Sequence, residues 1–237
     1  MSSGSEAHVS IHPVRIPVFG VTLDGDLAIP EGASGLVIFA HGTGSSRHSP
    51  RNKHVAGILH SAGLATLLMD LLTQREEGED LRTAQLRFDI GFLAGRLVGA
   101  TDWARGFPAT RDMSIGYFGA STGAAAAMVA AADRADVVRA VVSRGGRPDL
   151  AGDHLDKLCA PTLLIVGSKD DIVLKLNRLA MERMNCPKEL AVVEGATHLF
   201  EEPGALSEVG RLASRWFTRH LSGAAARRRA ASTTPTQ

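Results

Sequence analysis

The sequence has 237 residues, of which 44% are hydrophobic and 22% charged, proportions typical of a soluble globular domain with a sizeable core. The formal net charge of +1 gives no reason to expect a nucleic acid or an anionic membrane as a partner. Two cysteines exclude a disulfide framework, and the N-terminal sequence MSSGSEAHVS has neither the basic nor the apolar region of a signal peptide. We therefore expect a cytoplasmic protein.

The hydrophobic pattern predicts one domain over residues 13–222, between a flexible leader (1–12) and a disordered tail (223–237). The domain begins with a hairpin over residues 14–29. Continuous apolar runs then predict strands at residues 36–40, 64–72, 113–118, 137–143, 162–166 and 190–193. Helical spacing, or a run of strong helix formers, predicts helices at residues 52–61, 84–104, 173–184 and 203–221 and from residue 124 onward.

Strands and helices alternate almost throughout, which predicts a mostly parallel central sheet with helices on both faces. Ligands of such sheets bind at the carboxyl ends of the strands, so the residues after each apolar run are the candidates for a functional site. The sequence contains no Walker loop and no GxGxxG pattern, and the histidine spacing fits no metal-binding motif. We therefore expect no cofactor and no metal.

One strand ends in the sequence GYFGASTG (116–123), which places Ser121 between two glycines where a strand turns into an alanine-rich helix. Gly-x-Ser-x-Gly between a strand and a helix is the pattern of a nucleophile elbow, which exposes the serine hydroxyl. The alternative is a Gly/Ser turn in which Ser121 or Thr122 caps the helix.

A serine nucleophile needs a base and a third group that orients the base. Asp170 follows the strand over residues 162–166, and His198 follows the next strand along the chain. The chain order Ser121, Asp170, His198 is the order expected in this type of sheet. Asp171 is the rival acid. Asp170 is favoured because it is the fourth residue of Gly167-x-x-Asp170, and Asp171 is the more plausible cap of the helix over residues 173–184.

Acyl transfer also needs N–H donors where negative charge develops. We expect one from the amide of Thr122, directly after the nucleophile, and one from the loop HGTGSS that follows the strand over residues 36–40. Within this loop we favour the amide of Thr43, with Gly44 as the second choice. His41 is expected to be a structural hydrogen-bonding residue rather than the base.

The motifs HGTGSSRHSPRN (41–52), GYFGASTG (116–123), TLLIVGSKDDIV (162–173) and VEGATHLFEEPG (193–204) resemble those of α/β-hydrolases, and within that fold those of the dienelactone hydrolase family. The resemblance covers residues 36–221. Some bacterial proteins of this kind are fused to a phosphoribosyltransferase domain, which we do not expect within these 237 residues. Dienelactone hydrolases proper use a cysteine where this chain has Ser121, so the resemblance implies acyl-enzyme chemistry without implying the dienelactone substrate.

Two features bear on the substrate. Many α/β-hydrolases insert a helical cap after the strand that here ends at Ser143, but only a short segment (144–160) separates it from the next strand, so we expect no large cap domain. Arginines cluster in the loops at the catalytic edge: Arg47, Arg51, Arg144 and Arg147. They could hold a substrate carboxylate, or they could form salt bridges with nearby acids: Asp149, Asp153 and Asp171.

The sequence thus predicts a serine hydrolase that cleaves a small to moderate-sized carboxylic ester or lactone. An acyltransferase with the same triad is one alternative. A hydrolase-like module that only binds is the other, and the complete triad argues against it. The substrate and the oligomeric state do not follow from the sequence, because a fold does not determine a substrate.

Overall fold

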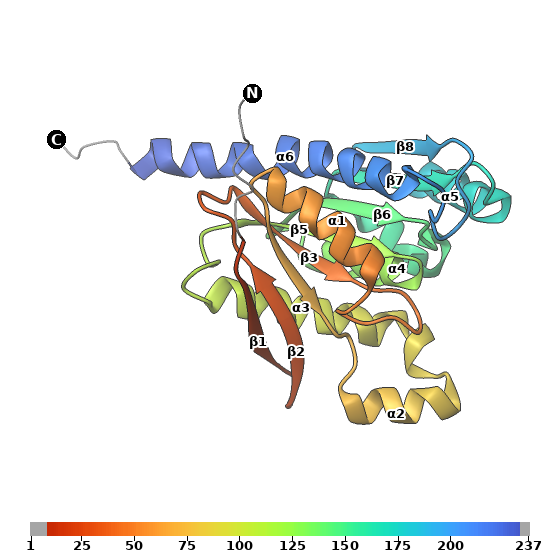
Figure 1. Ribbon diagram of the computed structural model, residues 1–237, viewed down its shortest axis with the longest axis horizontal. Coiled ribbons are helices and arrows are strands. Elements are labelled where there is room, and N and C mark those ends of the chain that lie inside the picture. Colours follow the sequence, from red (N-terminus) through yellow and green to blue (C-terminus); the bar gives the residue numbers. More distant parts are fainter. Residues whose placement is uncertain (1–8, 233–237) are drawn as a thin grey trace.

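The computed structural model describes residues 9–232, with side chains for residues 9–221. Eight strands form one sheet in the order β1-β2-β4-β3-β5-β6-β7-β8 (Figure 1). The strands are β1 (Ile11–Val18), β2 (Val21–Ala28), β3 (Gly35–Ala40), β4 (Ala65–Met69), β5 (Ser114–Ala120), β6 (Val138–Arg144), β7 (Thr162–Gly167) and β8 (Lys188–Val193). The pairs β1–β2 and β2–β4 are antiparallel, and every other pair is parallel.

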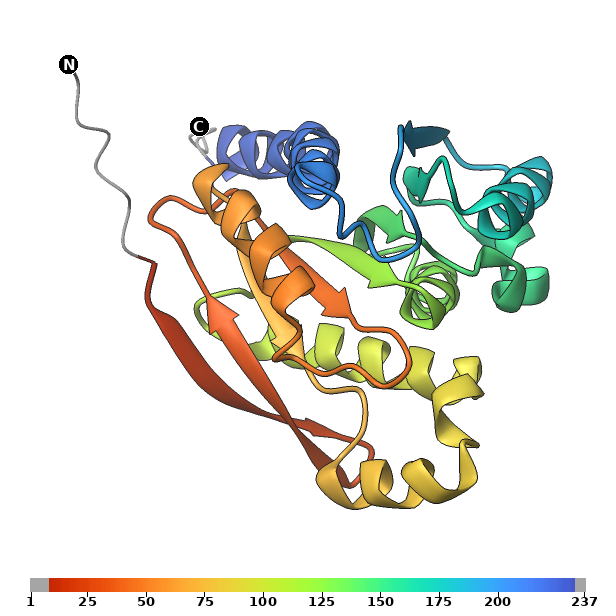
Figure 2. The same cartoon turned by 45° about the vertical axis from the view of Figure 1, so that its right-hand side comes forward.

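Helices cover both faces of the sheet, as the alternating pattern predicts (Figures 1 and 2). Helices α1 (Pro50–Ser61) and α6 (Ala205–Ser232) pack on one face, and their apolar residues form one core with that side of the sheet. Helices α3 (Ile90–Gly106), α4 (Thr122–Asp133) and α5 (Asp171–Arg183) belong to the core on the other face. The strands β3 to β7 are therefore buried on both sides, which explains their continuous apolar runs.

Neighbouring residues of β5 point to opposite faces of the sheet and pack in the two different cores. Tyr117 is fully buried on the α3 and α4 side, where its hydroxyl lies 2.6 Å from Oγ1 of Thr101. Phe118 points to the opposite face and packs on Phe39, with ring centroids 4.8 Å apart. Because both faces are packed, the end of β5 is held in place, and Ser121 directly follows this end.

The structure differs from the sequence-based expectation at both ends of the domain. Strand β1 begins at Ile11, so the last two residues of the expected leader belong to the sheet. Helix α6 continues to Ser232, through most of the segment expected to be a disordered tail. Its final turns are rich in alanine and arginine, which are strong helix formers even without an apolar stripe. Residues 1–8 and 233–237 lie outside the described residues.

The segment between β4 and α3 contains a helix that the apolar pattern did not predict. Helix α2 (Gln74–Thr83) is highly charged, and it is followed by a short 3-10 helix, η1 (Leu86–Phe88). A capping box starts α2: the Thr73 hydroxyl accepts from the Glu76 amide, and the Glu76 carboxylate accepts from the Thr73 amide. These polar contacts, rather than apolar periodicity, define the helix.

The segment between β6 and β7 forms only the 3-10 helix η2 (Pro148–Lys157). It packs against α4 and α5 and belongs to the core on that face. The expectation that no large cap domain follows β6 is therefore confirmed for this connection. None of the helices in the described part of the chain is long and apolar enough to cross a membrane.

Candidate active site

Ser121 lies in a sharp turn between the end of β5 and the start of α4, with φ 52° and ψ −122°. A serine rarely adopts this backbone conformation, and such strain of about 1–3 kcal/mol is typical of functional sites. The flanking glycines explain the motif. A Cβ at Gly119 would lie 2.4 Å from the Cα of Ala124, and a Cβ at Gly123 would lie 2.3 Å from the carbonyl oxygen of Ala40.

The main chain of Ser121 is held by the segment that follows β6. The Ser121 amide donates to the carbonyl of Arg144 at 3.2 Å, and the Ser121 carbonyl accepts from the amide of Arg147 at 3.2 Å. The side chain is half-buried, and its hydroxyl has no hydrogen-bond partner among the described residues. The hydroxyl is therefore held at the strand end without being engaged by another group.

Asp170 and His198 lie side by side at the carboxyl ends of β7 and β8. Oδ2 of Asp170 is 2.6 Å from Nδ1 of His198, and the carboxylate makes no capping bond to α5. The Asp170 side chain is 14% exposed and the imidazole 40%, so the ring reaches the surface while its partner is enclosed. Asp171 is exposed at the first position of α5, as expected for a residue at a helix start.

The loop that carries His198 is anchored on both sides. A Cβ at Gly167 would lie 2.3 Å from the carbonyl oxygen of Ala196, so only glycine permits this close approach between β7 and the loop. Beyond the histidine, the ring of Phe200 is 1% exposed and belongs to the core under α1 and α6. The backbone of Phe200 has φ 56°, which turns the chain so that the ring points inward.

The chain at Gly145 lies near His198, and the residue before it bonds Ser121. An added Cβ at Gly145 would lie 3.4 Å from both Nδ1 and Cε1 of His198, so the imidazole lies near this backbone. The preceding carbonyl, that of Arg144, accepts the hydrogen bond from the Ser121 amide. The chain at the end of β6 thus bonds Ser121 and lies near His198.

The loop after β3 lies against the nucleophile. A Cβ at Gly42 would be 3.0 Å from the Cβ of Ser121. The next amide, that of Thr43, donates to Oγ1 of Thr122 at 3.1 Å, and the two threonine hydroxyls are 3.0 Å apart. The structure thus brings together the two residues expected to supply oxyanion donors, with the Thr43 amide engaged by the Thr122 hydroxyl.

His41 supports this loop from below. Its Nε2 accepts from the amide of Leu71 at 3.1 Å, and its Nδ1 lies 3.0 Å from the carbonyl of Gly42, to which it donates. Burial lowers the pKa of His41, so the ring is neutral near pH 7. With both nitrogens engaged, His41 has the structural role expected of it and no free nitrogen to act as a base.

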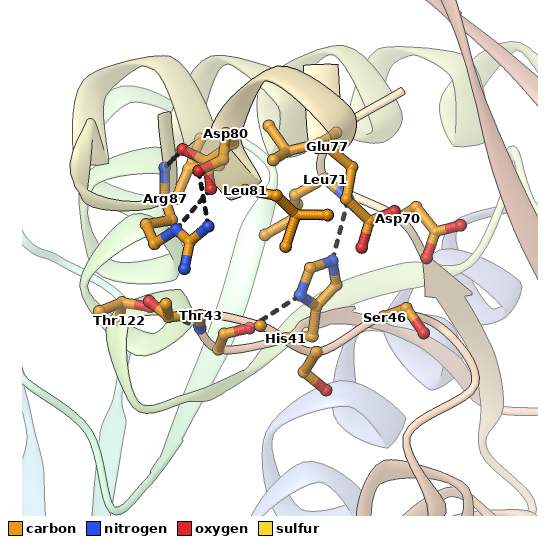
Figure 3. Close-up of a pocket in the computed structure, with 15 residues that line it drawn as sticks. His41, Thr43, Ser46, Asp70, Leu71, Glu77, Asp80, Leu81, Arg87 and Thr122 are labelled. Atoms are coloured by element: carbon orange, nitrogen blue, oxygen red, sulfur yellow. Dashed lines mark hydrogen bonds and ion pairs between the residues drawn. The ribbon is translucent and has the colours of Figure 1, made fainter. Parts of the chain in front are cut away.

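A pocket opens beside Thr43 and Thr122 and extends towards α2 (Figure 3). Leucines supply its apolar lining: Leu71, Leu72, Leu81 and Leu93. Above the pocket, Asp80 on α2 accepts a hydrogen bond from Nε of Arg87 at 2.5 Å, which ties α2 to η1. Ser121 and His198 do not line this pocket, which adjoins the loop after β3. Sequence reasoning missed it because α2 carries no apolar periodicity.

The arginines expected to contact substrate have different surroundings. Arg47 is paired with Asp70, which also accepts from the Arg47 amide at 2.7 Å. Arg147 forms a two-pronged pair with Asp149, at 2.9 and 2.8 Å. Arg144 alone has no acidic partner among the described residues. For Arg47 and Arg147 the salt-bridge alternative is therefore the one the structure contains.

Within the described residues, no group of three or more His, Cys, Asp or Glu could hold a metal ion.

Solved structures share this arrangement of sheet and helices. Est1E from Butyrivibrio proteoclasticus superposes with a TM-score of 0.73 at 17% identity, over 87% of this chain and 98% of that chain. An alpha-beta serine hydrolase homologue from Coxiella burnetii superposes with a TM-score of 0.70 at 20% identity, over 86% of this chain and 96% of that chain. The protein thus has an α/β-hydrolase fold, the class to which an elbow between a strand and a helix is suited.

A family model and relatives of higher sequence identity define the family within this fold. The model of the dienelactone hydrolase family matches residues 23–222, and the chain belongs to this family. A dienelactone hydrolase from Anabaena variabilis is 58% identical, with a TM-score of 0.89 over 90% of this chain and 99% of that chain. Two Mycobacterium tuberculosis proteins that carry the provisional name phosphoribosyl transferase are 55% identical over 210 residues, or 89% of this chain. The chain spans only 46% of their length.

Proposed function

We propose that this hydrolase is a serine hydrolase that cleaves a carboxylic ester or lactone of small to moderate size through an acyl-enzyme. The observation that carries the proposal is the 2.6 Å contact between Asp170 and His198 at the same sheet edge as the strained Ser121. Asp170 accepts from Nδ1–H, which leaves Nε2 of His198 as the basic nitrogen. Substrate-free hydrolases often lack the final serine to histidine hydrogen bond, which tightens only with substrate.

In the proposed reaction, Oγ of Ser121 attacks the acyl carbon while Nε2 of His198 takes the hydroxyl proton. The tetrahedral intermediate then collapses, the bond to the leaving oxygen breaks, and His198 passes its proton to that oxygen. Water attacks the acyl-enzyme in the same way, which releases the acid and restores the serine. Asp170 orients the imidazole and stabilises its cation throughout.

The amides of Thr122 and Thr43 are the proposed donors to the oxyanion. The amide of Thr122 is the first of α4, so it also carries the favourable field of a helix N-terminus. The amide of Thr43 donates to the Thr122 hydroxyl in the substrate-free protein. We propose that the oxyanion replaces this hydroxyl as the acceptor, which exchanges one hydrogen bond for a stronger one to a charged group.

The pocket beside Thr43 and Thr122 is the proposed place for the apolar part of the substrate, because it adjoins these donors. An acyltransferase, in which an alcohol or amine replaces the water, would use the same triad.

We do not propose the activity in the name of the Mycobacterium tuberculosis relatives, since the chain matches less than half of their length. The free cysteines Cys159 and Cys186 support a cytoplasmic location.

A fluorophosphonate probe tests the proposal. We expect it to add one covalent mass, located at Ser121 by peptide mapping, and Ser121→Ala to remove both labelling and hydrolysis of 4-nitrophenyl esters by about 10⁴-fold or more. Ser61→Ala, at an exposed serine in α1, serves as the matched control. A panel of esters, thioesters, lactones and amides then separates the substrate classes. Labelling at another serine, or none, would contradict the proposal.

A further inference from the structure

Asn177 is a fully buried amide in the middle of helix α5. Its Nδ2 donates to the carbonyl of Gly146 at 3.0 Å and to the carbonyl of Val173, one turn back in the same helix, at 2.8 Å. Its Oδ1 is enclosed without a hydrogen-bond partner among the described residues. An unpaired buried oxygen destabilises a fold, and a leucine of similar size would avoid this cost. What Asn177 contributes to the core is therefore its donor group, and the long-range bond of that group is to Gly146.

Gly146 belongs to a segment, residues 144–147, whose two central glycines restrict the backbone very little. At the first glycine, the amide of Gly145 donates to the carbonyl of Ile165 in β7 at 2.8 Å. For the backbone of Gly146, the bond from Asn177 is the only hydrogen bond within the described part of the chain. The Asn177 side chain thus holds the backbone at a point where the local sequence favours no single conformation.

The same segment bonds the proposed nucleophile and lies near the proposed base. The Ser121 amide donates to the carbonyl of Arg144, and the Arg147 amide donates to the carbonyl of Ser121, both at 3.2 Å. These distances are at the long end of the normal range for N–H···O bonds. A Cβ at Gly145 would lie 3.4 Å from Nδ1 of His198. A shift of this segment would therefore alter the surroundings of both Ser121 and His198.

Helix α5 also holds the acid of the proposed triad. Asp170 directly precedes the helix, and its carbonyl accepts from the amide of Leu174 at 2.8 Å. Asn177 follows about two helical turns later. Because α5 packs beside β7, β8 and η2, it forms a firm support at this end of the sheet (Figure 1). One helix thus holds Asp170 at its start and the 144–147 segment through Asn177.

We propose that Asn177 is a positioning residue for the reaction of Ser121. Its amide holds the Gly146 carbonyl, and the backbone held in this way keeps the Ser121 main chain in its strained conformation and at a fixed place relative to His198. Asn177 touches neither the substrate nor the reacting atoms and acts only through the 144–147 segment. The role in the reaction rests on the proposed function, whereas the ordering of the segment does not require catalysis.

Kinetics test the role in the reaction. Asn177→Leu keeps the size of the side chain and removes the donor. We expect kcat for 4-nitrophenyl esters to fall about 10- to 100-fold with KM nearly unchanged, because a small displacement of the reacting groups slows the chemical step. The melting temperature should change little, since the unpaired Oδ1 disappears while the Gly146 carbonyl loses its partner.

Ala180→Gly is the matched control, at the next buried position of α5. Glycine inside a helix destabilises it, and this variant leaves the bond to Gly146 in place. We therefore expect Ala180→Gly to be the less stable of the two variants and to keep the wild-type kcat. If Asn177→Leu fails to fold, Asn177→Ala, which removes the same donor in a smaller side chain, takes its place. An unchanged kcat after loss of the donor, or an equal loss in the control, would overturn the role.

Amide hydrogen exchange tests the ordering of the segment without any substrate. We expect the amides of Gly145, Arg147 and Ser121 to exchange faster in Asn177→Leu, relative to amides inside β5, and to keep their relative rates in Ala180→Gly. A fall in kcat without faster exchange would show that Asn177 does not act through the segment, and the proposal would be wrong.

The two measurements separate this proposal from the proposed function. If exchange is faster but kcat is unchanged, Asn177 orders the segment without positioning Ser121, and the role in the reaction is wrong. If the wild type cleaves no ester and no probe labels Ser121, the proposed function fails and the role in the reaction fails with it. The exchange rates still decide whether Asn177 holds the segment.

Discussion

The Asp170 carboxylate and the His198 imidazole are 28 positions apart in the chain, yet Oδ2 and Nδ1 are 2.6 Å apart. The contact follows from the topology. Strands β7 and β8 are neighbours in parallel register, so the residues that follow them meet at one edge of the sheet. Because the carboxylate accepts from Nδ1–H, it selects the tautomer whose Nε2 is free to act as a base. The pair has the geometry of a base and its orienting acid.

The first prediction distinguishes the two adjacent acids. Asp170→Asn should lower kcat by about 10⁴-fold, because an amide can donate to Nδ1 and so favours the wrong tautomer. Asp171→Asn should retain most activity, since Asp171 is exposed at the start of α5 and makes no contact with His198. Steady-state kinetics of both variants on one ester are sufficient. The opposite ranking would mean that Asp171 is the orienting acid.

The second prediction concerns Phe200, which anchors the histidine loop. Phe200→Ala should destabilise the fold by about 3–5 kcal/mol, because the ring is almost fully buried, and should also lower kcat because the loop loosens. His198→Ala should abolish turnover with a nearly normal unfolding free energy, since its imidazole is 40% exposed. Denaturant unfolding and esterase rates are measured for both. A fully active His198→Ala enzyme would place the base elsewhere.

The third prediction uses the second glycine of the elbow. Gly123→Ala should strongly reduce both stability and activity, because the new Cβ would lie 2.3 Å from the carbonyl oxygen of Ala40 and neither backbone can yield cheaply. Gly57→Ala is the matched control, in the middle of α1 with open space around its Cα. It should stabilise the helix by up to about 1 kcal/mol. Equal melting temperatures for the two variants would contradict this explanation of the motif.

The fourth prediction concerns pH and His41. Burial lowers the folded-state pKa of His41 below the unfolded value of about 6.5, so below that pH the unfolded chain binds more protons than the folded protein. The resulting stability is complete above pH 6.5 and is lost as the pH falls towards the folded pKa. His60 and His220, whose pKa values are also lowered by burial, add to the same slope.

The measurement is the unfolding free energy between pH 7.5 and 5. We expect wild-type stability to fall with acidification, and His41→Gln to be less stable at pH 7.5 but less sensitive to pH. His12→Gln, at an exposed position of β1, should follow the wild-type curve. A His41→Gln curve parallel to that of the wild type would show that His41 is charged, or exposed, in the folded protein.

Much of the fold could be predicted because its central strands, β3 to β7, are buried on both faces. Runs such as residues 36–40 and 162–166 are long enough to identify as strands, and the polar residues after them mark the functional edge. The order of strands across that edge depends on long-range packing, which local patterns do not contain. Helix α2 was missed because it is highly charged and has no apolar stripe. The extension of α6 was missed because its last residues favour a helix by propensity alone, without apolar periodicity.

In the candidate site, too, local patterns could be predicted from the sequence and long-range contacts could not. The positions of Ser121, Asp170 and His198 at one edge of the sheet could be predicted because each follows a strand with a recognisable turn, and their catalytic roles stay a prediction. The arginines could not be sorted, since their partners come from distant segments: Asp70 for Arg47 lies 23 positions away. The hydrogen bond between the Thr43 amide and the Thr122 hydroxyl was likewise invisible, because 79 positions separate the two residues.

Helix α2 forms part of the pocket wall but supplies no member of the proposed triad, and it lies in a single uninterrupted segment between β4 and α3. Under the proposed function, catalysis and substrate choice would be carried by separate stretches of chain. The stretch from Thr73 to Asp89 could be grafted from one family member onto another without disturbing the strand ends that hold the nucleophile. Under the proposed function, exchange of this one segment would change the substrate and leave the acyl chemistry in place.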